Sequence, residues 1–209
     1  MSQTITRLFD NYDDAVNAVH DLEELGISHD DLSIVANNAD DRHRAAVANH
    51  DGGINQDGDV TKGATTGAIL GGGAGLLAGL GMLAIPGLGP LVAAGWLAAT
   101  ATGVGVGAIG GGATGTIVGA LKNAGHSDEE AHVYSEGVRR GGTLVSAKIP
   151  DDRVAEAQAV LERNRSVDAL TRGAAYRETG WTRFDESAPA YSPDEVTAER
   201  ARYSDARTF

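Results

Sequence analysis

A long uncharged segment rich in glycine constrains this chain more than any other feature of its sequence. No charged residue occurs between Lys62 and Lys122, and within this segment glycines recur at every fourth position in two separate runs. Residues four apart lie on the same side of an α-helix, so each run predicts a helix with one face free of side chains. Two such faces allow helices to pack backbone against backbone. The glycines that we expect to pack in this way are Gly63, Gly67, Gly71, Gly75 and Gly79, and then Gly103, Gly107, Gly111, Gly115 and Gly119.

The sequence between the two runs predicts a turn. Residues 84–90 read Ala-Ile-Pro-Gly-Leu-Gly-Pro, and a helix does not continue through such a sequence. We therefore expect residues 63–121 to form a helical hairpin, a glycine zipper, with helices over residues 63–83 and 97–121. The first helix would be about 31 Å long, close to the roughly 30 Å of a bilayer core. Trp96 would lie near the start of the second helix, where interfacial indoles are often found.

The glycine hairpin has two interpretations. Its length favours insertion into, or tight association with, membrane lipid, which would place both flanking segments at the cytoplasmic face of a bacterial inner membrane. Glycine, alanine and threonine promote insertion less than leucine or isoleucine do. The alternative is therefore a cytoplasmic, soluble, self-associating structural or protein-binding module. Both interpretations predict a homo-oligomer, and neither identifies a protein partner.

The segment before the hairpin predicts a strand, a helix and a second strand. Residues 4–9 and 32–36 are rich in the apolar and β-branched residues that strands favour. Between them, apolar residues recur at helical spacing after Asn11, a typical N-cap residue, and Gly26 supplies the helix end. The following polar and acidic residues predict a linker.

The segment after the hairpin predicts two further helices and two strands. Ser127, with a glutamate three residues later, forms a capping box for the first helix, and Gly141 and Gly142 end it. Residues 143–149 alternate as in a strand, and a second helix starts after Pro150. Residues 166–170 predict a last strand.

Together the two flanks predict an α+β fold. The order of elements suits a small ferredoxin-like domain that is split by a Gly/Ala-rich helical hairpin and followed by a disordered C-terminal tail with few apolar anchors. The expected divisions are 1–36 for the first half of the domain, 37–62 for the acidic polar linker, 63–121 for the hairpin, 122–181 for the second half and 182–209 for the tail.

Charge and motifs argue against several classes of function. The net charge of −12 opposes binding to nucleic acid. The sequence lacks cysteine, and no serine lies in a nucleophile elbow. The histidines lack the spacing of metal ligands. Residues 105–110 match G-x-G-x-x-G, but they lie inside the glycine repeat without the preceding strand that a dinucleotide site needs. We therefore expect no catalytic residues, no metal and no cofactor.

Three stretches of the sequence resemble the bacterial general stress proteins of the YflT type, the heat-induced stress protein group. These stretches are LFDNYDDAVNAVHDLEELGISHDDLSIVA, GLLAGLGMLAIPGLGPLVAAG and EEAHVYSEGVRRGGTLVSAKI, and the similarity covers about residues 3–181. The resemblance implies a stress-induced, non-enzymatic bacterial protein with a split α+β domain around a glycine-zipper hairpin.

The most specific part of this resemblance is the motif EGVRRGG at residues 136–142. The motif also has a structural interpretation. Gly137 would permit close packing, and Arg139 and Arg140 suit the C-terminal end of a helix. The two glycines that follow would end that helix.

Overall fold

An antiparallel sheet built from widely separated parts of the chain organises this protein. The computed structural model describes residues 2–42, 80–101 and 116–205. Within these ranges the sheet has five strands in the order β1-β5-β2-β4-β3, and each neighbouring pair is antiparallel. The fold class is therefore α+β, as predicted. The strands are β1 (Ser2–Phe9), β2 (Leu32–Asn37), β3 (Gly81–Ile85), β4 (Gly89–Gly95) and β5 (Thr143–Pro150).

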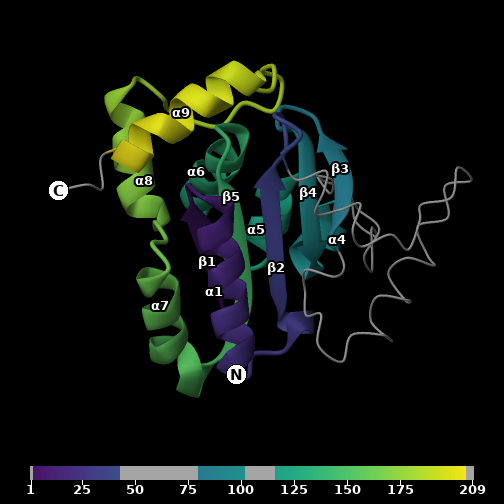
Figure 1. Ribbon diagram of the computed structural model, residues 1–209, viewed down its shortest axis with the longest axis vertical. Coiled ribbons are helices and arrows are strands. Elements are labelled where there is room, and N and C mark those ends of the chain that lie inside the picture. The colour runs from purple at the N-terminus through teal and green to yellow at the C-terminus, as the bar shows by residue number, and fades with distance from the viewer. Residues whose placement is uncertain (1, 43–79, 102–115, 206–209) are drawn as a thin grey trace, which may run out of the picture.

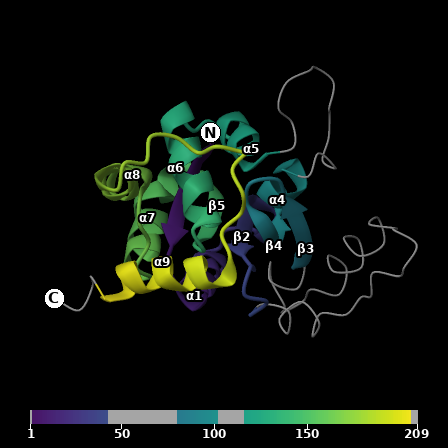
Figure 2. The ribbon, with the colours of Figure 1, turned by 90° about the horizontal axis from the view of Figure 1, so that it is seen from above.

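Helices cover both faces of this sheet (Figures 1 and 2). On one face, α1 and α7 pack over strand residues such as Ile5 and Phe9. On the other face, α4, α5 and α6 pack over Leu8 and Leu144, with α8 beside α6. Side chains alternate along each strand, so each face has its own apolar core. The helices are α1 (Tyr12–Glu24), α4 (Trp96–Ala101), α5 (Ile117–Asn123), α6 (Asp128–Arg139), α7 (Val154–Arg163) and α8 (Ala169–Glu178).

The local helix signals of the sequence are confirmed. Asn11 caps α1 by accepting a hydrogen bond from the backbone N–H of Asp13 at 2.9 Å. Gly26 follows this helix with a φ of +89°, a conformation that glycine adopts without strain. The capping box of α6 is complete, because Ser127 and Glu130 bond to each other's backbone N–H groups. The capping residues of the sequence therefore predicted these helix ends correctly.

The prediction of a helical hairpin is wrong for residues 80–95. Here β3 and β4 form a β-hairpin within the sheet. The expected turn is present, with Pro86 followed by Gly87 at a φ of +76°, and Leu88 N–H donates to the carbonyl of Ile85 at 3.0 Å. Proline followed by a glycine with positive φ is typical of a type II turn. Residues 81–83, which we assigned to the first helix, belong to β3 instead, and the buried centre of β4 inside the sheet is part of the domain core.

The predicted helix over residues 97–121 is interrupted. α4 ends at Ala101, and α5 begins after Thr116, whose extended backbone and side chain form a new N-cap. Trp96 belongs to the domain: its indole N–H donates to the carbonyl of Asp31 at 3.1 Å, and Lys148 Nζ lies 4.6 Å from its ring centre. Within the described ranges, no helix has both the length and the apolar character needed to cross a bilayer.

Most of the predicted glycine zipper lies outside the described residues. Gly119 lies in α5, which packs against α6. The run from Gly63 to Gly79, the run from Gly103 to Gly115, residues 43–62 of the acidic linker and the G-x-G-x-x-G segment all fall outside. The zipper itself therefore stays a prediction.

The C-terminal part of the chain differs from the prediction in two places. Residues 166–170 do not form a strand: Val167 makes an isolated bridge to Leu8, and Asp168 then caps α8 by accepting from Thr171 N–H at 2.8 Å. The tail after residue 182 is ordered in α9 (Pro193–Asp205), which lies across one end of the sheet (Figure 1). The tail orders because its charged side chains find partners on the domain, so its polar composition was misleading.

Candidate functional site

An open cleft of about 460 Å³ follows the outer edge of β1. Its floor is formed by residues 2–7 of β1. One wall is the connection between α5 and α6 at residues 124–126, and Gln158 of α7 contributes from the other face of the sheet. Ligand sites in proteins usually measure about 300–1,000 Å³, so this cleft has the size of a binding site.

The edge of β1 directs backbone groups into this cleft. Leu8 N–H donates to the carbonyl of Val167 at 3.0 Å, and Val167 N–H donates back to the carbonyl of Leu8 at 2.7 Å. Backbone groups of successive residues alternate in direction along an antiparallel strand. Thr4 and Thr6 therefore point their N–H groups the same way, away from β5. Among the described residues, Val167 alone pairs its backbone with this edge. Thr6 is buried and its carbonyl already accepts hydrogen bonds from side chains, so the part of the edge that can accept another strand is Ser2 to Thr4.

A network of hydroxyl and imidazole groups fixes the wall of the cleft on the α6 side. Thr6 Oγ1 lies 2.7 Å from His126 Nε2 and 2.9 Å from Ser146 Oγ. The hydroxyl of Tyr134 donates to the carbonyl of Thr6 at 2.7 Å, and Arg7 Nη1 donates to the same oxygen at 3.1 Å. These bonds join β1, β5 and α6, so the cleft is held in shape without a ligand.

The environment of this network shifts three pKa values. Burial lowers the pKa of His126, and the opposing effect of the Glu130 carboxylate is smaller. Burial would raise the pKa of Glu130, but the hydrogen bonds from the N–H and hydroxyl groups of Ser127 outweigh it and lower that pKa. Burial raises the pKa of Tyr134 to about 12. At neutral pH the imidazole and the phenol are therefore uncharged hydrogen-bonding groups.

The same network superficially resembles a hydroxyl-imidazole-carboxylate triad. A nucleophile has to be reachable by its substrate, and Thr6 is only 1% exposed. The carboxylate that would complete the triad is engaged elsewhere. Glu130 lies 3.9 Å from His126 Nδ1 and accepts two hydrogen bonds from Ser127. In the part of the chain that the structure describes, no three His, Asp or Glu side chains are placed to hold a metal ion. This geometry supports recognition better than catalysis.

The EGVRRGG motif lies at a second site, beneath α9. A Cβ atom on Gly137 would lie 2.6 Å from Leu8 Cδ2, so glycine is needed where α6 meets β1. Gly141 has a φ of +100°, and a Cβ atom there would lie 2.5 Å from Val196 Cγ1 of α9. The expected close packing at Gly137 is thus confirmed, and Gly141 both ends the helix and makes room for α9.

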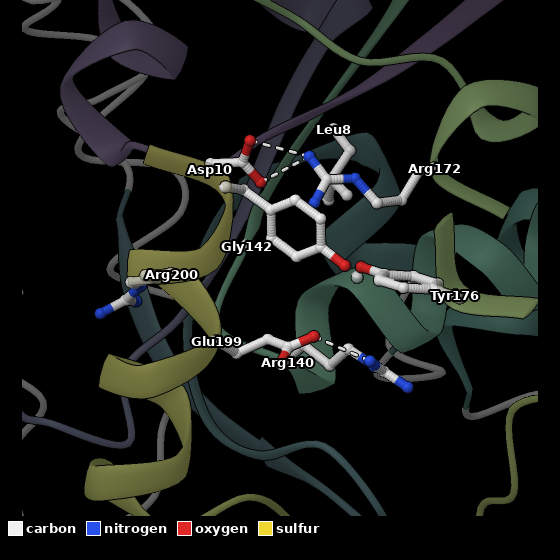
Figure 3. Close-up of a pocket in the computed structure, with 10 residues that line it drawn as sticks. Leu8, Asp10, Arg140, Gly142, Arg172, Tyr176, Glu199 and Arg200 are labelled. Carbon is white, nitrogen blue, oxygen red and sulfur yellow. Dashed lines mark hydrogen bonds and ion pairs between the residues drawn. The ribbon is translucent and has the colours of Figure 1, made fainter. Parts of the chain in front are cut away.

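Charged side chains surround a small cavity of about 10 Å³ at this second site (Figure 3). That volume suffices for about one water molecule. Arg140 Nη1 donates to Glu199 Oε1 at 2.7 Å, and its Nε donates to the fully buried Glu136 at 2.6 Å. Arg172 Nη2 reaches both carboxylate oxygens of Asp10 at 2.7 Å. Each arginine is therefore compensated by a carboxylate of this chain.

Burial and charge shift the pKa values at the second site as well. Burial opposes the charge of Arg140, but hydrogen bonds to Glu136 and Glu199 outweigh it and raise the pKa of this guanidinium. Burial raises the pKa of Tyr176, whose ring centre lies 4.2 Å from Arg140 Cζ. The arginines are therefore permanently charged at this site, and the phenol is neutral.

Sequence reasoning missed most residues of both sites. Of the zipper glycines that we predicted as packing residues, Gly119 is within the described residues and lines neither cleft nor cavity, and the others lie outside the described residues. Thr6 and His126 are 120 positions apart, and no local pattern joins them. The sequence did contain a helix-start signal for α9, because Ser192 and Glu195 form a reciprocal capping interaction with Pro193 between them.

Comparison with known proteins gives no match at any level. No family model matches the sequence, and no curated protein and no solved structure is significantly similar to it.

Proposed function

We propose that this chain is a non-enzymatic protein-binding module that takes up an extended segment of a partner protein along the outer edge of β1. The observation that carries this proposal is the edge of β1 from Ser2 to Thr4, which pairs with no strand of the described residues and lies on the floor of an open cleft. An added strand would bond to the backbones of Ser2 and Thr4, as Val167 does to Leu8. Alternate side chains of that strand would then contact the two walls.

The walls favour a single extended segment over the edge of a second domain. They rise on both faces of the sheet, from residues 124–126 and from Gln158. A second copy that approached edge to edge would bring its own two walls against these. Because the chain has a net charge of −12, long-range attraction favours a partner segment with basic residues near the bound strand.

The proposal includes a general stress-response role and a ferredoxin-like domain. The stress-response role rests on the resemblance to the YflT-type stress proteins. Support for the ferredoxin-like domain comes from the order Val167-β1-β5-β2, with α1 and α7 on one face, because Val167 takes the place of a short fourth strand. The β3-β4 hairpin would then be an insertion that widens the sheet.

Membrane association is the second candidate function, and the uncharged glycine repeat favours it. Residues 63–79 would contact lipid and place the domain at the cytoplasmic face of a bacterial inner membrane. Assembly of a homo-oligomer through the zipper belongs to the same proposal. Fractionation of the untagged protein, followed by a carbonate wash and detergent extraction, separates a membrane-bound chain from a soluble one.

The edge proposal is tested with a phage-displayed library of random ten-residue peptides. We expect selected peptides to be basic and to slow hydrogen exchange at the backbone amide of Thr4. Thr4→Pro removes an outward N–H group at a strand edge, where proline is tolerated. This change should weaken binding by about 0.5–1.5 kcal/mol, roughly 2- to 12-fold, for each hydrogen bond lost.

The matched control is Thr4→Val, which keeps the backbone N–H group and the preference for a strand. We expect it to bind selected peptides as the unchanged protein does. Equal binding by the proline and valine variants would contradict strand addition. Failure to select any peptide, or selection of peptides that leave the Thr4 amide unprotected, would also count against the proposal.

A further inference from the structure

The C-terminal strap, residues 181–205, covers α6 and one end of the sheet. It leaves the end of α8, crosses α6 and returns as α9 (Figure 2). Phe184 and Val196 are its buried apolar anchors. A Cβ atom on Gly87, in the β3-β4 turn, would lie 2.8 Å from the carbonyl oxygen of Glu186 in the strap. The strap therefore touches the β3-β4 turn as well as α6.

The surface beneath the strap contains buried polar atoms that lack hydrogen-bond partners. Within the described residues these atoms are both ring nitrogens of His132, Oε2 of Glu136 and Nε of Arg139, all on α6, together with the indole nitrogen of Trp181 on the strap itself. Buried polar groups in folded proteins are normally paired, and an unpaired one destabilises the closed state. Lifting the strap would let water reach these atoms. The contact is therefore poorly optimised for permanent closure.

The strap contributes aromatic rings and a carboxylate to arginines of the domain. Arg139 Cζ lies 5.8 Å from the ring centre of Phe184 and 5.2 Å from that of Tyr191. Figure 3 shows Glu199 reaching to Arg140, which it meets at 2.7 Å. Ionic and cation-π interactions therefore dock the strap in addition to its apolar anchors.

The same pattern continues at the end of α9. Arg172 Cζ lies 3.8 Å from the ring centre of Tyr203. Without the strap, the arginine face, which we define as Arg139, Arg140 and Arg172, would keep the carboxylates of Asp10 and Glu136. One positive charge would then be uncompensated, on a chain whose net charge is −12. This face would attract an acidic partner, in contrast to the rest of the molecule.

A glycine that ends α8 marks the start of the strap. Gly180 has a φ of +83°, and its N–H donates to the carbonyl of Arg177 at 3.0 Å. Glycine adopts this conformation without strain, so the chain turns here from α8 into the strap. The strap then extends to α9 through residues 182–192, which form no helix or strand.

We propose that the strap is a displaceable internal ligand, and that the arginine face binds an acidic, tyrosine-containing helical segment of a partner protein when the strap lifts. The partner segment would repeat what the strap supplies: a carboxylate for Arg140, and aromatic rings for Arg139 and Arg172. This interaction is separate from strand addition at β1, because the two sites share no lining residue.

The test uses a fluorescent synthetic peptide with the sequence of residues 181–205 as the probe, added to the full-length protein. The unchanged protein should bind it weakly, because its own strap competes. Glu199→Gln removes the carboxylate that holds Arg140, so it should bind the unchanged peptide at least tenfold more tightly. A peptide that carries Glu199→Gln should bind at least tenfold more weakly than the unchanged peptide.

Two further variants keep the outcome decisive. Asp194→Asn removes the same charge from an exposed position of α9 and should bind the peptide as the unchanged protein does. Val196→Ala loosens the apolar anchor without changing charge and should strengthen binding, even if Glu199→Gln fails to fold.

Three results would overturn the proposal. The first is that no peptide binds to either loosened variant, and the second is equal binding by all four proteins. The third is a concentration-dependent dimer of Glu199→Gln that excludes the peptide. That dimer would show that the occupant is the strap of a second copy instead of a separate partner.

Discussion

The two candidate sites of this protein are both polar, but they differ in how their polar groups are satisfied. At the β1 cleft, Thr6, His126, Ser146 and Tyr134 bond to one another within the domain, and the cleft stays open. Beneath the strap, ion pairs are combined with buried atoms that have no partner in the described residues. The first site is therefore organised before anything binds. The second gains hydration when it opens, which is the property expected of a switch.

The largest effect should come from Arg140→Ala. This change leaves the buried carboxylate of Glu199 without its closest partner and removes one of two arginines from Glu136. We expect a loss of about 3 kcal/mol in the free energy of unfolding, measured by urea denaturation.

Arg163→Ala is the control for this experiment. Its guanidinium is 66% exposed and pairs with Asp21 at 3.1 Å, so its loss should destabilise by less than about 1 kcal/mol. Similar losses in free energy of unfolding for both variants would show that ion pairs of the arginine face stabilise the fold no more than an exposed ion pair does. That result would contradict the difference drawn between the two sites.

The next effect concerns hydrogen exchange of the backbone amides. If the strap opens while the sheet stays folded, amides of α9 should exchange roughly 100-fold faster than those of α6, a difference of about 2.7 kcal/mol in opening free energy. Nuclear magnetic resonance of the native protein measures the exchange rates of the α9 amides and of the α6 amides. Exchange of α9 and α6 at the same slow rate would mean that the strap opens only when the whole domain unfolds.

A smaller effect is expected at the β1 cleft from Tyr134→Phe. The lost hydroxyl donates to the carbonyl of Thr6, which still accepts from Arg7. We expect a loss of about 1 kcal/mol in the free energy of unfolding, again from urea denaturation. Thr197→Val, which removes an exposed hydroxyl that donates to the carbonyl of Pro193 in α9, is the control. No difference between the two variants would show that the network does not hold the cleft in shape.

The smallest effect is a dependence of stability on pH. The pKa of His126 is lowered in the folded state, so the unfolded chain binds the proton first. This contribution to stability is complete above the ordinary histidine pKa of about 6.5, and it is lost as the pH falls through the lower folded value. His132 has a lowered pKa too, because of its burial and the nearby Arg183, so it acts with the same sign.

Denaturation at pH 7.5 and pH 5 checks this dependence. Each single variant, His126→Gln and His132→Gln, should lose less stability between these two values than the unchanged protein does. The carboxylates with lowered pKa values, such as Asp21 and Asp40, titrate below this window and should not obscure it. An unchanged pH dependence in both variants would contradict the assignment.

Sequence reasoning succeeded where the deciding interactions are local. Asn11, Gly26 and the pair Ser127 and Glu130 act within a few residues of themselves, so their patterns indicate helix ends directly. The short apolar runs of β3 and β4 do not distinguish a strand from a helix by periodicity. We assigned residues 63–83 to a helix and residues 63–121 to a helical hairpin because of glycines that lie mostly outside the described structure. The sheet pairing that decides the structure of β3 and β4 is non-local.

The candidate sites were harder to predict than the fold for the same reason. Glu199 is 59 positions from Arg140, so the motif at residues 136–142 was recognisable while its partner was not. The tail carried a local helix signal at Ser192 and Glu195, but its low apolar content outweighed that signal in our prediction. A low content of apolar residues indicates that a segment can bury little apolar surface. It does not register ion pairs, and charged side chains contribute much of the contact between α9 and the domain.

The position of β5 between β1 and β2 has a consequence for synthesis on the ribosome. The first two strands are separated in the finished sheet by a strand that ends at Pro150. An emerging chain therefore holds β1 and β2 without their shared neighbour until most of the sequence has been made. Such non-local pairing slows folding, and during that time unpaired strand edges are available for aggregation. We expect the nascent chain to need protection by chaperones for longer than a domain built from consecutive hairpins.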